Sequence, residues 1–303
     1  MPDLPSYDQL PIRAGLPPGS AWGVWGDGDR LGALNLLTPE RRLRAAASIR
    51  SGRSFGLNLE LTLPDPPLYG RPPVRHEVLA RRRTANDDVY LELNTQSSSQ
   101  WDGFRHIAHP DHGNFGGLAS EDHGLEAWAG AGIVGRGVVL DVDRWRTRIG
   151  RPLRQGEGDP ITADDLRACI ADQGTPVEVG DILLMRTGWL TWYRDLDHDA
   201  RAAQAELASS PGIAGRDALA FLWDLHIAAI ASDNPAVEMA PWPDGFLHHD
   251  LLPLLGIPLG ELWDLDALAA DCDADGTYDC FLAAAPLHMP GGVASPANAV
   301  AIR

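Results

Sequence analysis

The chain has 303 residues, of which 44% are hydrophobic, and it carries a formal net charge of −17 at pH 7. This length and apolar fraction are sufficient for a large buried core. Nucleic acid and anionic membrane surfaces both require clustered positive charge, so the acidic balance argues against either partner. All 25 basic residues are arginine, which excludes a Schiff-base lysine, a pyridoxal phosphate anchor and a phosphate-binding loop ending in Gly-Lys-Ser/Thr.

The three cysteines and the N-terminus indicate the compartment. The cysteine count is odd, and no Cys-x-x-Cys pair is present, so neither a disulfide framework nor a zinc ribbon is expected. Residues 1–15 lack the basic cap and apolar run of a signal peptide. The longest apolar stretches, such as 251–259, are too short to span a bilayer. These features predict a cytoplasmic protein.

The first third of the chain contains one clear helix signal. Residues 1–35 are rich in Gly, Pro and Trp and are predicted to form an extended arm. Thr38, Pro39 and Glu40 are typical of a helix start, with Thr38 as the cap, and the helix is predicted to reach about Ile49. Residues 54–63 alternate as a strand does. Residues 64–75 hold five prolines and predict a loop.

The rest of the chain interleaves predicted strands and helices. Strands are predicted at 89–93, 138–142, 182–186, 227–231 and 281–286. Helices are predicted after the cap formed by Thr162 and Asp165, and at 199–207, 216–223 and 245–255. The elements do not repeat as strict strand–helix–strand units. We therefore predict one α/β domain of mixed α+β type, with mixed β-sheets, over residues 1–303.

Half of the ten histidines lie in one part of the chain. The five are His76, His106, His109, His112 and His123. Mixed with Asp102 and other acidic residues, they indicate a metal site or a polar active-site loop. The alternative is a solvated loop with incidental histidines, and the composition leaves both possibilities open.

A second group consists of His248, His249 and Glu261. The turn at 256–260 has glycine at both ends, so it could return Glu261 toward the histidines. The alternative is that the histidines lie at the surface and Glu261 starts another helix. The residues taken alone favour this alternative.

Other known motifs are absent or incomplete. Residues 271–276 copy the first half of a calcium loop, but its twelfth position is Leu282 where a bidentate Glu is needed. They predict a polar turn. The sequence has no His-Glu-x-x-His and no Gly-x-Gly-x-x-Gly after a strand, so those metalloprotease and dinucleotide-binding templates do not apply. Residues 52–56 fit Gly-x-Ser-x-Gly, but they lead into a predicted strand and not from a strand into a helix, as the elbow of a serine hydrolase requires.

One segment points to a family. Gln96-Ser-Ser-Ser-Gln100-Trp101-Asp102-Gly-Phe-Arg-His106 resembles the signature His-x-Gly-Thr-His-x-Asp-x-x-x-His of the metal-dependent cyclase superfamily, which includes kynurenine formamidases and isatin hydrolases. In that family the first two histidines and the aspartate bind a divalent metal, and the last histidine is the catalytic acid/base. Asp102 and His106 match, whereas Gln96 and Gln100 replace the two metal histidines. The replacement indicates a divergent subgroup.

Further segments resemble the family in the same order along the chain. They are residues 22–37, the Gly-Asp-x-x-Leu-x-x-Thr-Gly-Trp pattern at 180–189, the His and Glu spacing of His249 and Glu261, and residues 286–296. The resemblance therefore implies the swivelling β/β/α fold of kynurenine formamidase. It also implies a homodimer or homotetramer.

The resemblance implies a site as well as a fold. The implied metal ligands are Gln96, Gln100, Asp102, His249 and Glu261, with His106 as the catalytic acid/base. Because a glutamine amide offers a carbonyl oxygen in place of an imidazole nitrogen, this set is rich in oxygen and should bind an ion less tightly. The implied cofactor is one divalent ion, with manganese and zinc as first choices and magnesium and calcium as alternatives.

The implied function is hydrolysis of an amide or lactam bond in a small aromatic or cyclic substrate. Trp101 and Trp25 are predicted to contact this substrate, with core packing as the alternative for Trp101. Two other functions remain open. One is a cyclase or dehydratase that acts on a polyketide-like substrate with little or no need for metal, and the other is a non-catalytic ligand-binding homologue.

Overall fold

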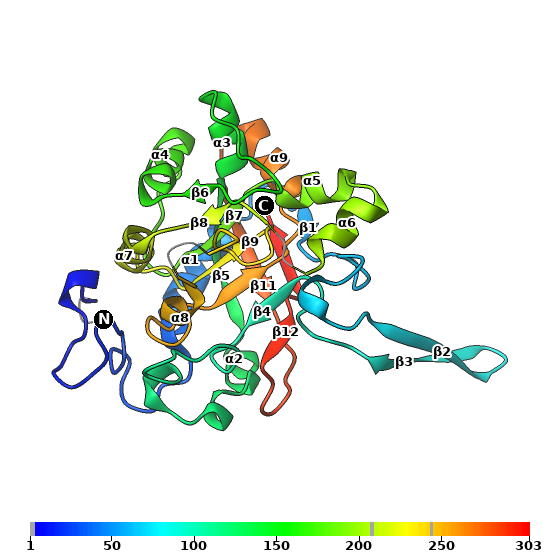
Figure 1. The fold of residues 1–303 in the computed structure, drawn as a ribbon, viewed down its shortest axis with the longest axis horizontal. Coiled ribbons are helices and arrows are strands. Elements are labelled where there is room, and N and C mark those ends of the chain that lie inside the picture. The colour runs from blue at the N-terminus through cyan, green and yellow to red at the C-terminus, as the bar shows by residue number, and fades with distance from the viewer. Residues whose placement is uncertain (1–3, 207–208, 243–244) are drawn as a thin grey trace.

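The computed structural model describes residues 4–206, 209–242 and 245–303. A mixed sheet in the order β1-β13-β11-β5-β7-β9-β10-β4-β12 runs through the molecule (Figure 1). Its strands are β1 (Ser54–Gly56), β4 (Gln100–Asp102), β5 (Ile133–Asp141), β7 (Ile182–Arg186), β9 (Ala229–Ser232), β10 (Leu259–Glu261), β11 (Asp279–Ala284), β12 (Ala294–Pro296) and β13 (Ala299–Ile302). The predicted mixed α/β class is confirmed.

The centre of the sheet is parallel and its two sides are antiparallel. Strands β5, β7, β9 and β10 run parallel to one another. β11 pairs antiparallel with β5, and β4 pairs antiparallel with both β10 and β12. The central strands are buried on both faces, which explains why their sequences are continuous apolar runs.

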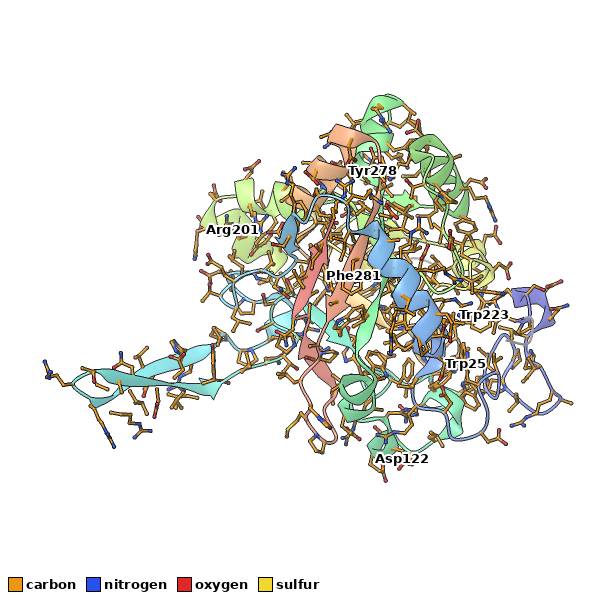
Figure 2. All side chains as sticks on the ribbon, turned by 180° about the vertical axis from the view of Figure 1, so that it is seen from behind. Trp25, Asp122, Arg201, Trp223, Tyr278 and Phe281 are labelled. Atoms are coloured by element: carbon orange, nitrogen blue, oxygen red, sulfur yellow. The ribbon has the colours of Figure 1, made fainter. Side chains whose placement is uncertain are left out.

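Helices pack around this sheet. They are α1 (Pro39–Ala45), α2 (Glu126–Ala131), α3 (Val142–Arg148), α4 (Ala163–Gln173), α5 (Trp189–Asp195), α6 (His198–Gln204), α7 (Arg216–Asp224), α8 (His248–Leu251) and α9 (Asp266–Asp275). α1 packs along β5 on the face seen in Figure 2. No helix in the described ranges is long and apolar enough to cross a membrane.

Two small sheets lie outside the main one. β2 (Arg75–Arg82) and β3 (Ala85–Glu92) form a hairpin that extends away from the rest of the molecule (Figure 1). β6 (Pro160–Ile161) and β8 (Gly212–Ile213) pair in parallel. The prolines of residues 64–75 lie in the predicted loop, which leads into the hairpin.

Several predicted elements are shorter than expected. The strand predicted at 54–63 ends at Gly56. The Leu57 amide still donates to the Ala299 carbonyl at 3.0 Å, but the Leu59 amide donates to the Ser99 side chain, at Oγ and 2.8 Å. The helix predicted at 245–255 is α-helical only at His248–Leu251, because Pro253 cannot donate a helical hydrogen bond. The end of the helix predicted at 199–207 lies outside the described residues.

The polar turn predicted at residues 271–276 is wrong, because these residues lie in α9 and its C-cap. Asp271 and Asp275 bind the guanidinium of Arg303, which is buried near the chain end. Asp271 and Asp275, four residues apart, lie on the side of the helix that faces Arg303, whereas Asp273 pairs with Arg144. The calcium-loop pattern is therefore incidental.

Residues 22–37, which resemble the N-terminal part of the family's longer members, form a hydrogen bond to the turn after α8. Asp29 Oδ2 accepts from the Gly32 amide at 2.6 Å, and Asp29 Oδ1 accepts from Asn35 Nδ2 at 2.7 Å. The Ala33 amide donates to the Gly256 carbonyl at 2.8 Å. This segment is thus bonded directly to the chain that links α8 to β10.

The Thr-Gly-Trp end of the 180–189 pattern has a structural role. The fully buried Asp233, just after β9, accepts hydrogen bonds from the Thr187 amide at 2.6 Å, the Thr187 hydroxyl at 2.8 Å and the Gly188 amide at 2.8 Å. These bonds tie the ends of β7 and β9 together beside the start of α5.

Gly32 should be intolerant of a side chain. Its φ is +54°, and a Cβ would collide with the Gly256 carbonyl and lie 2.6 Å from Phe104 Cζ. We expect Gly32→Ala to lower the free energy of unfolding by about 3 kcal/mol, from overpacking added to backbone strain. Gly28→Ala is the matched control, because Gly28 has a φ of +80° and open space around an added Cβ. We expect this substitution to lower the free energy of unfolding by about 1 kcal/mol. Equal losses in urea unfolding would contradict the contact with Gly256.

Candidate functional site

The pairing of β4 with β10 builds the floor of the candidate site. Gln100 lies opposite Glu261 in the register, and Asp102 lies opposite Leu259. Because side chains alternate along a strand, Gln100 and Asp102 share one face of β4 and Trp101 occupies the other. The face that carries Gln100, Asp102 and Glu261 is buried.

Three buried side chains converge on this floor: Asp102, His248 and Glu261. One donor atom from each lies within 4.8 Å of the others, so the three could hold a metal ion. His248 Nε2 is 3.1 Å from Glu261 Oε1. Burial raises the pKa of Glu261, and the charge of Asp102 raises it further. A cation here would relieve the repulsion between two carboxylates that water cannot screen.

Glu238 holds His248 in place from the other side. Its carboxylate accepts from the Leu247 amide at 2.7 Å and from the His248 amide at 3.0 Å, and it also bonds to His248 Nδ1. Burial opposes the protonated form of His248, but the hydrogen bonds to Glu238 and Glu261 outweigh it and raise the pKa. A carboxylate on the second nitrogen of a histidine is the usual support for a metal ligand, since it fixes the ring and leaves the first nitrogen for the ion.

These residues therefore fit a divalent ion, which would take the place of the proton between His248 Nε2 and Glu261. The donor set contains one imidazole nitrogen and two carboxylates. Such a mixed set suits manganese and zinc, and its oxygens also suit magnesium.

The two glutamines lie beside the carboxylates as hydrogen-bond donors. Gln96 Nε2 donates to Asp102 Oδ1 at 2.8 Å, and Gln100 Nε2 donates to Glu261 Oε2 at 2.5 Å. The glutamine side chains thus reach the predicted site, where their amide nitrogens bond to the carboxylates. Arg71 Nη1 donates to the Gln96 backbone carbonyl and lies 3.5 Å from Gln100 Oε1.

His106 lies at the edge of the cluster. Gln96 Nε2 is 3.1 Å from its Nδ1, and Asp102 Oδ2 is 3.7 Å from its Nε2. Burial lowers the pKa of His106, although Asp102 opposes the shift. The imidazole is therefore largely neutral near pH 7, which is the form that can accept a proton.

A cavity of about 130 Å³ opens beside these groups. Its polar lining comes from Tyr69, Arg71, His106, His248 and Glu261. The apolar lining comes from Pro235, Ala236, Trp242 and Phe246, and the Phe246 ring stacks on His248 with centroids 4.3 Å apart. A small organic molecule in this cavity would contact both an apolar wall and the titratable cluster.

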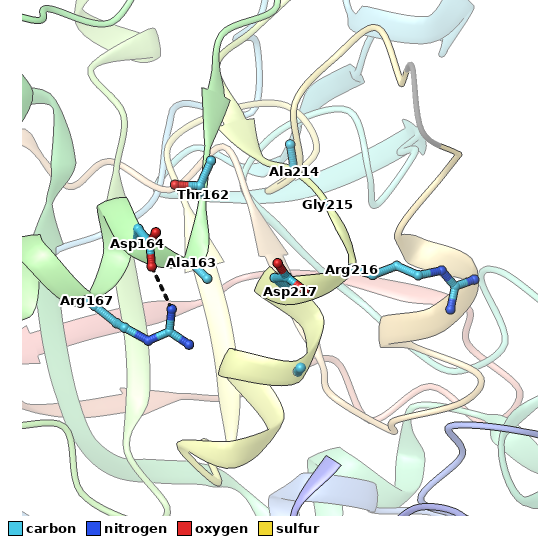
Figure 3. Close-up of a pocket in the computed structure, with 9 residues that line it drawn as sticks. Thr162, Ala163, Asp164, Arg167, Ala214, Gly215, Arg216 and Asp217 are labelled. Carbon is cyan, nitrogen blue, oxygen red and sulfur yellow. Dashed lines mark hydrogen bonds and ion pairs between the residues drawn. The ribbon is translucent and has the colours of Figure 1, made fainter. Parts of the chain in front are cut away.

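A larger depression of about 520 Å³ lies between the starts of α4 and α7 (Figure 3). Its charged lining is Asp164, Arg167, Arg216 and Asp217, and Asp164 is paired with Arg167 at 2.9 Å. None of the predicted site residues lines it. Its size alone does not make it the chemical site, because its charged groups are exposed and two of them pair with each other.

The prediction that His249 lies beside Glu261 is wrong: the structure places His248 there. His249 is partly exposed, and its ring lies 5.2 Å from Phe246 and 6.4 Å from His109. The two histidines are adjacent in the short helix α8, so their side chains point about 100° apart. Tertiary packing decides which one faces the cluster.

The two tryptophans predicted to contact substrate do not line the site cavity. Trp101 is fully buried on the opposite face of β4 and packs edge-on against Trp263, with centroids 4.8 Å apart. Trp25 packs against Trp223, 5.9 Å away, beside the N-terminal segment (Figure 2). Trp242 lines the cavity instead.

Of the five clustered histidines, only His106 lies in the site. His76 pairs with Asp88 on the exposed hairpin, and His109 and His112 stack on each other in a loop. His123 is buried and its Nε2 is 2.8 Å from the Phe115 carbonyl. None of these four histidines lines the site cavity among the described residues.

A family model described as "Putative cyclase" matches residues 46–239. A crystal structure described as a novel cyclase is 33% identical, covers 94% of this chain and 99% of its own, and superposes with a TM-score of 0.84.

The chain belongs to the cyclase family.

Isatin hydrolases have the same fold as this cyclase-family protein. Isatin hydrolase A from Labrenzia aggregata, solved with benzyl benzoate, is 19% identical, covers 85% of this chain and 94% of its own, and has a TM-score of 0.60. Isatin hydrolase A from Ralstonia solanacearum is 18% identical, covers 88% and 98%, and has a TM-score of 0.59. No curated protein matches the sequence.

Sequence reasoning missed Glu238, Tyr69, Arg71 and Trp242. Glu238 carried a usable signal, since it is a single charge inside the apolar run Ala-Val-Glu-Met-Ala, and a buried charge needs a partner. Tyr69 and Arg71 lie in the proline-rich loop, where no periodic pattern distinguishes one residue from another.

The adjacent histidines offer a matched pair for a stability test. His248→Ala would leave Glu238 and Glu261 buried without their cation, and a loss of about 3 kcal/mol in the free energy of unfolding is expected at pH 8. The hydrogen bonds to Glu238 and Glu261 raise the pKa of His248 from its ordinary 6.5 to about 10. The charge of His248 therefore stabilises the folded protein fully below pH 6.5 and less as the pH rises toward 10, so the loss should be larger at pH 6 than at pH 9. His249→Ala should change stability by less than about 1 kcal/mol. Equal losses in urea denaturation would contradict the central position of His248.

Proposed function

We propose that this cyclase-family protein is a metal-dependent hydrolase of an amide or lactam bond in a small aromatic or cyclic substrate. The observation that carries the proposal is the convergence of Asp102, His248 and Glu261 beside a largely neutral His106 at one cavity. Isatin hydrolases, which have the same fold, are named for isatin, a small bicyclic lactam. This likeness of fold supports the reaction class only as an analogy.

Asp102, His248 and Glu261 would hold the ion, with Glu238 fixing the histidine. A divalent ion bound there would act as a Lewis acid and lower the pKa of a water molecule. Manganese or zinc is our first expectation for the ion, and magnesium or calcium follows from the oxygen donors.

His106 performs the proton transfers in this proposal. Its neutral imidazole accepts a proton from the attacking water at a ring nitrogen and returns a proton to the leaving nitrogen of the substrate. The Gln96 amide, which lies between Asp102 and His106, keeps the ring oriented toward the cavity. Trp242 and Phe246 exclude water from the apolar wall.

A metal-independent cyclase or dehydratase is the second candidate. The amides of Gln96 and Gln100 already donate to the two carboxylates, and His248 already pairs with Glu238 and Glu261. The cluster is therefore hydrogen-bonded without an ion. Acid/base chemistry by His106 on a polyketide-like substrate would need nothing more.

Metal content separates the two candidates. The hydrolase proposal expects about one divalent ion per chain by elemental mass spectrometry, on protein prepared without chelator or polyhistidine tag. At an ion concentration 100 times its dissociation constant, the protein should gain about 2.7 kcal/mol of stability. Asp102→Asn should lose both the ion and the gain. A wild-type protein that stays metal-free in excess manganese or zinc would support the second candidate.

Replacement of His106 tests the catalytic assignment. We expect His106→Ala to reduce kcat for an N-formyl arylamine or an isatin-like lactam by a factor of about 10² to 10⁴, which is the usual contribution of a general acid/base. The ion content and the melting temperature should change little, because His106 is not among the three metal-binding groups. His109→Ala, in the neighbouring loop, is the control. A folded His106→Ala variant with full activity would remove this role.

A further inference from the structure

Two hydrogen-bond donors in the lining of the site cavity have no acceptor among the described residues. They are the buried Tyr69 hydroxyl and the buried Trp242 indole Nε1. Buried polar atoms are almost always paired in folded proteins, because an unpaired donor forfeits its hydrogen bond to water. Two unpaired donors around one cavity indicate that a ligand supplies the acceptors.

Arg71 provides a positive charge at the same place. It is the one arginine in the cavity lining. Its guanidinium is held by the bond from Nη1 to the Gln96 carbonyl and by stacking over the Tyr69 ring, 5.2 Å from the ring centre. In the described ranges Nε and Nη2 make no hydrogen bond, so one edge of the guanidinium stays available. An arginine fixed in this way matches the two oxygens of a carboxylate.

The backbone at Tyr69 adds a third observation. Tyr69 has φ +60° and ψ +30°, the left-handed conformation that an aromatic residue rarely adopts. Its amide donates to the Ala205 carbonyl at 2.6 Å. Such conformations persist where the surroundings impose them, and they cluster at ligand sites. The loop thus places the Tyr69 ring beneath Arg71 at a cost in backbone strain.

The cavity is the size of one ring. Its volume is about 130 Å³, and an engineered apolar cavity of about 150 Å³ holds benzene. The wall formed by Pro235, Ala236, Trp242 and Phe246 suits the ring, while Tyr69 and Arg71 lie among the polar lining.

We propose that Tyr69 and Arg71 form an anion-binding subsite that selects single-ring aromatic substrates bearing a carboxylate. The hydroxyl of Tyr69 and the free edge of Arg71 donate to the carboxylate oxygens, and the ring lies against Trp242 and Phe246. The binding of such a ligand is inferred from the cavity alone. Its hydrolysis rests on the proposed hydrolase function. Neither residue touches the reacting bond, so both determine specificity.

Binding of benzoate and of acetophenone, its neutral analogue of the same shape, tests the subsite directly. Isothermal titration of the protein as purified should give at least tenfold tighter binding for benzoate. In Arg71→Gln the ratio of the two affinities should fall to near one. Arg81→Gln, which removes one positive charge from the exposed hairpin, is the matched control and should keep the wild-type ratio.

Tyr69→Phe gives a second readout that a structural role would not produce. Removing an unpaired buried hydroxyl should leave the melting temperature unchanged or higher, while benzoate binding weakens about fivefold. A similar affinity for benzoate and acetophenone in the wild type would overturn the proposal. So would a preference for benzoate that survives in Arg71→Gln, because the carboxylate would then be bound elsewhere, for example by the ion.

Activity measurements separate this inference from the proposed function. With formanilides that carry or lack a ring carboxylate, Arg71→Gln should lower kcat/KM for the acid, through KM, by at least ten times the factor by which it changes kcat/KM for the neutral substrate. If neither formanilide is hydrolysed but the benzoate preference and its loss in Arg71→Gln are found, the hydrolase proposal fails and the subsite stands.

Discussion

The burial of several carboxylates in one small volume is the constraint on which the site depends. Asp102 and Glu261 come from two paired strands, and Glu238 precedes α8. Negative charges so far from water require cations or strong hydrogen-bond donors nearby. His248, the amides of Gln96 and Gln100, and Arg71 at the edge meet that requirement. The remaining architecture, including the N-terminal segment bonded to the turn after α8, keeps these groups together.

The two glutamines supply the buried carboxylates with uncharged hydrogen-bond donors. An amide can donate to a carboxylate at every pH, whereas a neutral imidazole with its free nitrogen can bind a metal. The glutamines therefore stabilise the carboxylates when no ion is bound, and they leave Asp102, His248 and Glu261 as the three groups suited to an ion. One ion, and not two, is consistent with this donor set.

The elements that were predicted well are those with a strong local pattern. The capped helix after Thr162 and the strands β7 and β9 follow from capping residues and apolar runs, which act over a few residues. The strand predicted at 54–63 and the helix predicted at 245–255 were too long, because contacts with Ser99 and the presence of Pro253 ended them. For the site, the resemblance of one segment to the family signature pointed to Asp102 and His106, and the structure places their side chains 3.7 Å apart. The choice between His248 and His249 could not, since adjacent positions on a short helix differ only in direction.

The sequence by itself determined the family resemblance, the mixed α/β class and the group of acidic and histidine residues from which a site is made. These depend on residue type and spacing along the chain. The tertiary structure alone decided which side chains share a cavity. It buried Trp101 in the core, brought Glu238 to His248 and placed Tyr69 and Arg71 in the cavity lining. Those contacts join residues far apart in sequence, and they are set by strand register and by the burial of charge.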